Sequence, residues 1–203
     1  NVTNLKGKSI SSTEITVNWI APVIRPGKSV YHVEVRDMIV GIIVQNLTAD
    51  GYKNQSLTVS SLKEYWVYQF IVYASTSKGS SSPVHSDNVT TEEAAPEAPI
   101  DLDVIYYNGY NCNATVVNFT WKDPTLEDRN GKIVEYMIKI TKGVAKTYIK
   151  SITDPDPYSK QSQTWWEIIE VLPDQENDLQ VQAITETKIE GTKAKKSFKS
   201  ITC

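Results

Sequence analysis

Six asparagines stand in the N-x-Ser/Thr pattern that N-linked glycosylation requires, and none has proline at the middle position. Attachment of a sugar to the side-chain amide needs passage through the secretory pathway and a surface position. The alternative is a cytosolic protein rich in Asn, Ser and Thr, but six matches exceed what that content places by chance. We therefore expect a glycosylated extracellular protein with acceptors at Asn1, Asn46, Asn54, Asn88, Asn113 and Asn118.

No arrangement of residues typical of catalysis is present. The chain has no G-x-S-x-G turn, no phosphate-binding loop, no H-E-x-x-H pair and no paired C-x-x-C. The histidines, His32 and His85, are well separated, and His32 is expected to face solvent. Asp101 and Asp103 could suggest calcium, but a calcium site gathers six or more oxygens, so a solvated strand face is the simpler interpretation. We expect no enzyme activity, no metal and no cofactor.

Composition limits the remaining classes of function. The chain has 203 residues, of which 40% are hydrophobic and 22% charged, as in ordinary globular proteins. A net charge of −3 argues against a general nucleic-acid binder. The longest apolar run, Met38 to Val44, is far shorter than the roughly 20 residues that span a bilayer. We expect this chain to be part of a longer, membrane-anchored protein.

An internal repeat divides the chain. Ser12 to Pro22 and Ala114 to Pro124 both alternate apolar and polar residues into a tryptophan, with a proline three positions later. Further matches follow at slowly growing offsets, which indicates small loop insertions in the second copy. Between the copies, Thr90 to Pro99 is acidic and contains two prolines. We expect a short, semi-rigid linker there, with domains at 1–93 and 94–203.

Apolar residues recur with a period of two, which predicts strands. Val117, Phe119 and Trp121 should enter a core, while Asn118 and Thr120 face water. About seven short strands per copy, separated by Gly, Pro, Asn and Asp, predict an all-β chain of two antiparallel two-sheet sandwiches.

The residues of both copies resemble the fibronectin type III pattern. A tryptophan stands in the second expected strand of each copy and a tyrosine in the third. In the first copy Leu62 precedes a tyrosine corner at Tyr68; the second copy has Asn177 there, so its corner is looser or is held by the amide. The residues that carry the resemblance are Trp19, Trp121, Tyr31, Tyr136, Phe70, Val72 and Ala74.

The stretch Asn130 to Tyr136 resembles the extracellular parts of receptor-type protein tyrosine phosphatases and neural adhesion molecules. A cytokine receptor is disfavoured, because no W-S-x-W-S box is present. The resemblance implies extracellular recognition of another protein, with a copy of the same chain as one possibility. A passive spacer and a heparan sulfate-binding module are the alternatives. Any enzymatic domain would belong to the cytoplasmic part of the parent chain.

The two cysteines, Cys112 and Cys203, are expected at the same end of the second sandwich, given the alternating strand directions. A bridge between them would close a loop of about 90 residues and stabilise the domain by roughly 4–5 kcal/mol in the chain-entropy account. Free thiols, or pairing with cysteines elsewhere, are the alternatives.

Three surfaces are candidates for binding. Trp165 is expected to face outward with Ile169, and Trp166 inward; the outward tryptophan is either exposed to a partner or covered by the long segment that precedes it. Ile39 and Ile43 should form an apolar strip on a probable edge strand, exposed to a partner, shielded by a glycan on Asn46 or folded over locally. Lys193, Lys195 and Lys199 share a strand face opposite Phe198; they suit a polyanion or are solvated.

Overall fold

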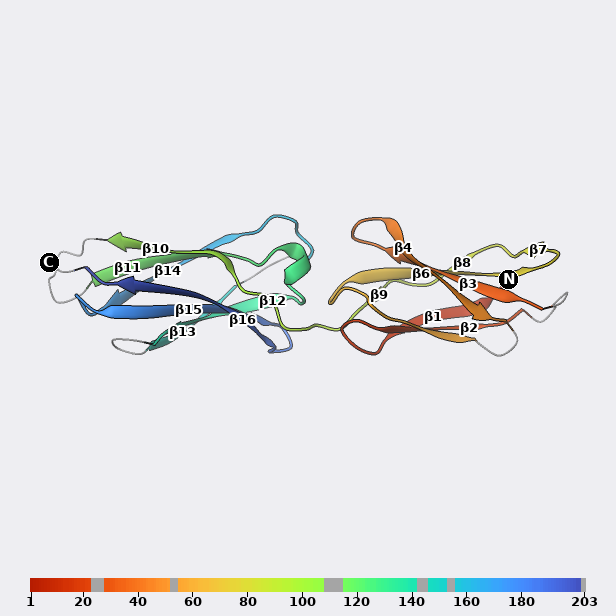
Figure 1. Ribbon diagram of the computed structural model, residues 1–203, viewed down its shortest axis with the longest axis horizontal. Coiled ribbons are helices and arrows are strands. Elements are labelled where there is room, and N and C mark those ends of the chain that lie inside the picture. Colours follow the sequence, from red (N-terminus) through yellow and green to blue (C-terminus); the bar gives the residue numbers. More distant parts are fainter. Residues whose placement is uncertain (23–27, 52–54, 108–114, 142–145, 153–155, 202–203) are drawn as a thin grey trace. The chain divides into compact units, whose positions relative to one another are not determined.

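The computed structural model in Figure 1 describes residues 1–22, 28–51, 55–107, 115–141, 146–152 and 156–201. The chain divides into two compact units, Asn1–Glu92 (unit 1) and Glu93–Cys203 (unit 2). Each unit is a sandwich of two antiparallel sheets, and the expectation of an all-β chain is confirmed.

Unit 1 has one three-stranded sheet in the order β1-β2-β5, formed by β1 (Thr3–Ser9), β2 (Ile15–Ile20) and β5 (Ser56–Val59). The facing sheet contains β4 (Ile42–Asp50), β3 (Val30–Asp37) and β6 (Val67–Thr76), with β4 at its edge. Three short strands, β7 (Gly79–Ser80), β8 (Val84–His85) and β9 (Val89–Thr90), pair with the other side of β6.

The core of unit 1 lies between these sheets. Alternate residues of β2, β3 and β6 are buried, which follows from the two-residue repeat of a strand. Trp19 and Tyr31 meet edge to face with ring centroids 5.2 Å apart. The tyrosine corner predicted at Tyr68 is confirmed, because its hydroxyl accepts the Lys63 N–H at 2.8 Å.

Three hydroxyl residues tie the last segment of unit 1 to β6, and we call Ser81, Ser86 and Thr91 the hydroxyl ties. Each of these residues makes two hydrogen bonds to one partner residue in β6 or directly before it. Its backbone N–H donates to the partner's carbonyl, and its side-chain oxygen accepts the partner's backbone N–H. The partners are Ala74 for Ser81, Phe70 for Ser86 and Trp66 for Thr91, with side-chain bonds of 3.1, 3.0 and 2.8 Å. The ties therefore satisfy amides that the interrupted strands leave without a ladder partner.

Unit 2 repeats this strand order. One sheet is β10-β11-β14, formed by β10 (Ile100–Tyr107), β11 (Thr115–Lys122) and β14 (Thr164–Val171). The other is β13-β12-β15-β16, formed by β13 (Lys146–Ser151), β12 (Ile133–Ile140), β15 (Glu176–Thr185) and β16 (Glu190–Lys199). A 3-10 turn, η1 (Leu126–Asp128), follows β11. Trp121 and Tyr136 repeat the edge-to-face pair at 5.5 Å.

The corner that lacks tyrosine in unit 2 is held by two other side chains. The buried amide of Asn177 donates to the Gln175 carbonyl at 2.9 Å. Ser200 also bonds this turn, since its hydroxyl lies 2.6 Å from the Leu172 carbonyl and accepts the Gln175 N–H at 2.8 Å. The corner is therefore fixed by a residue that follows the last strand.

The segment predicted as a linker is incorporated into the two units. Within unit 1, Glu92 N–H donates to the Ser11 carbonyl at 3.2 Å. Within unit 2, the Glu93 carboxylate accepts the Lys132 N–H at 2.8 Å, and the Pro96 carbonyl accepts the Thr192 N–H at 2.8 Å. The predicted short linker is confirmed, since the boundary between the units falls within Thr90 to Pro99, and the residues on each side of the boundary bond to their own unit.

Candidate functional site

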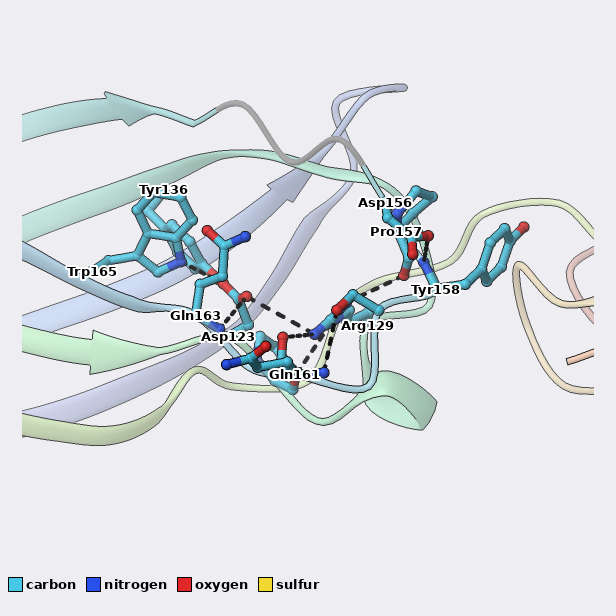
Figure 2. Close-up of polar contacts among 11 residues, drawn as sticks. Asp123, Arg129, Tyr136, Asp156, Pro157, Tyr158, Gln161, Gln163 and Trp165 are labelled. Atoms are coloured by element: carbon cyan, nitrogen blue, oxygen red, sulfur yellow. Dashed lines mark hydrogen bonds and ion pairs between the residues drawn. The ribbon is translucent and has the colours of Figure 1, made fainter. Parts of the chain in front are cut away.

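A buried polar cluster in unit 2 positions one of the predicted interface residues. The Asp123 carboxylate accepts the Tyr136 hydroxyl at 2.7 Å and the Gln163 N–H at 3.0 Å, and it also accepts the indole N–H of Trp165. Arg129 lies 3.9 Å from the same carboxylate, and both charged side chains are buried. Figure 2 shows these groups converging on Asp123.

Arg129 connects this cluster to the long segment before β14. Its guanidinium donates to the carbonyls of Pro124, Pro157 and Gln161 at 3.3, 3.3 and 3.5 Å (Figure 2). Buried charges persist when paired and hydrogen-bonded. The cluster therefore has a structural role, and it holds the described part of that segment against the sandwich.

The predicted orientation of the two adjacent tryptophans is wrong. Trp165 is half-buried against the core, and Ile169 is only 3% exposed, whereas Trp166 is 56% exposed. Trp165 lies opposite Trp121, and Ile169 opposite Val117, in the β11–β14 pair. Directly paired residues point to the same face of a sheet, so both follow the core face of β11. Trp165 and Ile169 are not available as a binding surface.

An exposed apolar strip is present in unit 1, but it is formed by the even-numbered residues from 38 to 44 and not by the predicted Ile39 and Ile43. Residues 38–41 form the turn between β3 and β4, and Ile39 and Ile43 are half-buried, so the expectation that these two face outward is wrong. The pairing with β3 shifts where Val35 lies opposite Gln45 and Arg36 opposite Ile43, which leaves Val44 as an extra residue in β4. The exposed apolar strip consists of Met38 (36%), Val40 (52%), Ile42 (55%) and Val44 (44%).

The turn that carries this strip is rigidly held. The buried Asp37 carboxylate accepts the N–H groups of Ile39 and Val40 at 2.8 and 3.0 Å. Gly41 closes the turn at φ +86, a conformation that side chains with a Cβ disfavour. The strip is therefore displayed on an ordered hairpin at the sheet edge.

The lysines of β16 face outward as predicted, but they differ in their partners. Lys199 lies 2.9 Å from the Asp174 carboxylate, and this contact raises the pKa of Lys199. Lys193 and Lys195 lie opposite Gln182 and Gln180, and Lys139 of β12 lies opposite Gln180 on the other side. Within the described ranges Lys139, Lys193 and Lys195 form no ion pair. The basic face thus includes Lys139, which sequence spacing missed.

The remaining candidates for chemistry have ordinary structural partners. Asp101 and Asp103 lie 2.8 and 2.7 Å from Lys122 and Lys196. His32 lies on the outward side of β3, as expected, where it is half-buried, lies 2.7 Å from the Ser75 hydroxyl and stacks on Tyr73. Over the described parts of the chain, no three His, Cys, Asp or Glu residues gather to hold a metal. No helix there is long and apolar enough to cross a membrane.

The glycosylation acceptors occupy several kinds of surface. Asn1, Asn46 and Asn88 are exposed, and Asn118 is half-buried in the middle strand of a sheet. Asn54 and Asn113 lie outside the described residues, as do Cys112 and Cys203. Occupancy of the acceptors and the disulfide stay predictions.

Comparison with known proteins agrees with this architecture. Residues 1–91 match the Fibronectin type III domain family. The crystal structure of chicken CNTN1 FN1-FN3 domains is similar in fold at a TM-score of 0.66 and 18% identity, covering 99% of this chain and 66% of that one.

Two curated relatives are much longer than this chain. The chain is 26% identical to Tyrosine-protein phosphatase Lar of Drosophila melanogaster over 90% of this chain and 9% of the relative. It is 28% identical to Phosphatidylinositol phosphatase PTPRQ of Homo sapiens over 73% of this chain and 6% of the relative. The chain thus spans less than a tenth of either relative.

Proposed function

From a chain that consists of two fibronectin type III β-sandwiches in tandem, we propose a recognition segment in the extracellular part of a cell-surface receptor. Its similarity to segments of two phosphatases supports a receptor-type phosphatase as the parent protein. Fibronectin type III domains are not catalytic, so the segment acts by binding and by holding its neighbours in the parent chain apart.

The observation that carries a recognition role is the exposed strip Met38, Val40, Ile42 and Val44. Solvent-facing edge strands normally carry charge or proline instead. Since Asp37 and Gly41 already order the turn, binding costs little conformational entropy. Four side chains do not fill an interface of about 800 Å² per partner, so the strip supplies the apolar centre of a larger contact with another extracellular protein.

Sedimentation of the secreted chain over a wide concentration range tests this role. The double variant Val40→Ser/Ile42→Ser removes the centre of the strip. Ile10→Ser, an exposed isoleucine of unit 1 outside the strip, is the matched control. We expect the wild type and the control to self-associate or to bind a member of a panel of cell-surface ectodomains. The double variant should do neither.

Absence of self-association and of binding for all three proteins would leave the passive spacer as the function. Equal binding by all three would place the contact outside the strip. The same comparison after Thr48→Ala, which removes the Asn46 acceptor, separates a protein contact from a glycan shield. A strip that binds only in Thr48→Ala is a shielded one.

Heparan sulfate is a second candidate ligand, because Lys139, Lys193 and Lys195 share one face without ion pairs in the described structure. Immobilised heparin with a salt gradient tests it, since polyanion binding weakens as salt screens the charges. We expect Lys193→Gln/Lys195→Gln to elute at lower salt than the wild type, and Lys8→Gln of unit 1 to elute unchanged. Flow-through of the wild type at physiological salt would remove this candidate.

A further inference from the structure

The outward face of the β10-β11-β14 sheet carries an apolar patch around one glycosylation acceptor. Trp166, Ile168 and Ile105 are 56%, 49% and 45% exposed. Asn118 on the middle strand β11 lies opposite Ile105 on one side and Ile168 on the other. Paired residues share a face, so the acceptor stands between the two isoleucines.

Trp166 completes the patch beside the acceptor sequence. It lies opposite Thr120, the hydroxyl residue of the Asn118-Phe119-Thr120 sequence. Lys150 holds the tryptophan in place, since its ammonium lies 5.1 Å from the centre of the Trp166 ring and donates to the Trp166 carbonyl at 2.9 Å. A cation over an aromatic face is an attractive contact. The indole is therefore a positioned, exposed, apolar surface.

From this arrangement we infer that Asn118 carries an N-glycan whose first sugar lies on Trp166, Ile168 and Ile105. An amide in the middle of the patch directs any attached sugar across it. The C–H face of an N-acetylglucosamine ring is apolar and suits an indole face. A glycan there excludes a protein partner from the same patch. The acceptor sequence Asn118-Phe119-Thr120 therefore reserves the patch for a sugar.

The inference rests on the extracellular location proposed above, and it adds a role for one acceptor. The solvent side of an antiparallel sheet is usually polar, so a contiguous apolar patch on that side marks a contact. Here the partner is covalently attached. The sugar covers the patch in every molecule, independent of concentration.

Peptide mapping of the whole chain, secreted from a glycosylating host, is the first test. We expect Asn118 to be modified. Unmodified Asn118 beside occupied Asn46 or Asn88 would overturn the inference and leave the proposed location standing. A chain without glycan at any acceptor would contradict the location itself.

Proton NMR of the chain trimmed to one N-acetylglucosamine per site tests the contact. The acetyl methyl signal that disappears in Thr120→Ala and persists in Thr120→Ser belongs to Asn118. We expect ring-current displacement of this signal, lost in Trp166→Ala. A signal at the same position in the wild type and in Trp166→Ala would overturn the contact.

Stability supplies an independent measure. We expect Thr120→Ala to lower the melting temperature of the glycosylated chain more than that of the chain made in a host without N-glycosylation. In the Trp166→Ala background this difference should shrink. If Thr120→Ala lowered the melting temperature equally with and without glycan, in the wild type and in Trp166→Ala, only the threonine would matter, and a sugar that rests on Trp166 would be contradicted.

Discussion

One buried carboxylate, that of Asp123, determines that Trp165 packs against unit 2 and does not form a binding surface. Asp123 receives three hydrogen bonds and approaches Arg129, and this arrangement keeps Trp165 away from solvent. The corresponding position of unit 1 is Ala21, which cannot form such a cluster. The extra carboxylate explains how unit 2 holds a longer segment before its fifth strand.

Asp123→Ala should destabilise unit 2 by about 3 kcal/mol, because it leaves Arg129 and the indole N–H of Trp165 buried without their partner. Denaturant titration with a probe in each unit measures the change. Trp166→Ala in the unglycosylated chain, an exposed change on the same strand, should cost far less. Equal costs for the two variants would contradict the structural role of the cluster.

Glu93 makes unit 2 sensitive to acid. Partial burial would raise the pKa of Glu93, but hydrogen bonds from Thr187, Lys132 and Thr185 outweigh it and lower the pKa. A depressed folded-state pKa means that the stabilisation is present above the unfolded value of about 4.3. It is lost as the pH falls through the folded value.

Glu93→Gln should therefore flatten the loss of stability of unit 2 below pH about 4.3. Thermal melts between neutral and acidic pH check this. Glu97→Gln, an exposed glutamate nearby with no side-chain bond in the described structure, serves as the control. Parallel pH profiles for the wild type and Glu93→Gln would show that this carboxylate does not carry the effect.

At the scale of the elements, turns and ties replace regular pairing in both units. The β3–β4 turn depends on Gly41, where a Cβ would meet no atom within 4 Å but would strain a backbone at φ +86. Gly41→Ala should cost unit 1 roughly 1–2 kcal/mol from this strain alone. Denaturant unfolding measures the cost. A cost near zero would mean that the turn relaxes, and that the strip is less ordered than described.

The hydroxyl ties make a second element-scale prediction. Ser86→Ala leaves the buried Phe70 N–H without its acceptor, which should cost about 1–2 kcal/mol. Ser82→Ala, on an exposed residue of the same segment, should cost little. Hydrogen exchange at the Phe70 amide, faster in Ser86→Ala alone, would tie the loss to this bond.

Sequence predicted the elements better than the directions of their side chains. Local alternation indicated the strands, and the resemblance of the tryptophan and tyrosine positions to the fibronectin type III pattern implied the corner at Tyr68. In β14, however, the two faces have similar compositions: the odd residues combine three apolar side chains with one glutamate, and the even residues combine two apolar side chains with a threonine and a glutamate. Only the pairing of Trp165 with Trp121 decides which set enters the core, and that register is not local.

The buried charges and the basic face escaped prediction for a related reason. Charged residues are expected at the surface, so Asp123 and Arg129 gave no signal. Lys139 joins Lys193 and Lys195 only through cross-strand pairing with Gln180. A residue that acts through its neighbours in another strand cannot be identified from spacing along one strand.

At the scale of the whole molecule, each unit has its own core between its own two sheets. Residues 1–92 and 93–203, expressed separately, should each fold and unfold cooperatively, as single domains of this size do. Circular dichroism and thermal melts of the two pieces check this. A piece that stays unfolded would show that its core needs the rest of the chain.

The two units end differently under load. In unit 2 the last strand, β16, is a single strand of ten residues whose pairing with β15 shifts register once, whereas unit 1 ends in three two-residue strands with a hydroxyl tie after β7, β8 and β9. A stretching force on the end of unit 1 therefore acts on three separate sets of hydrogen bonds, those of the hydroxyl ties, which can break one after another. We expect single-molecule pulling to show unit 1 lengthening in small steps, and Ser86→Ala to remove one of them. Unit 1 would thus lengthen gradually under tension, whereas unit 2 would stay folded until its last strand separates as a whole.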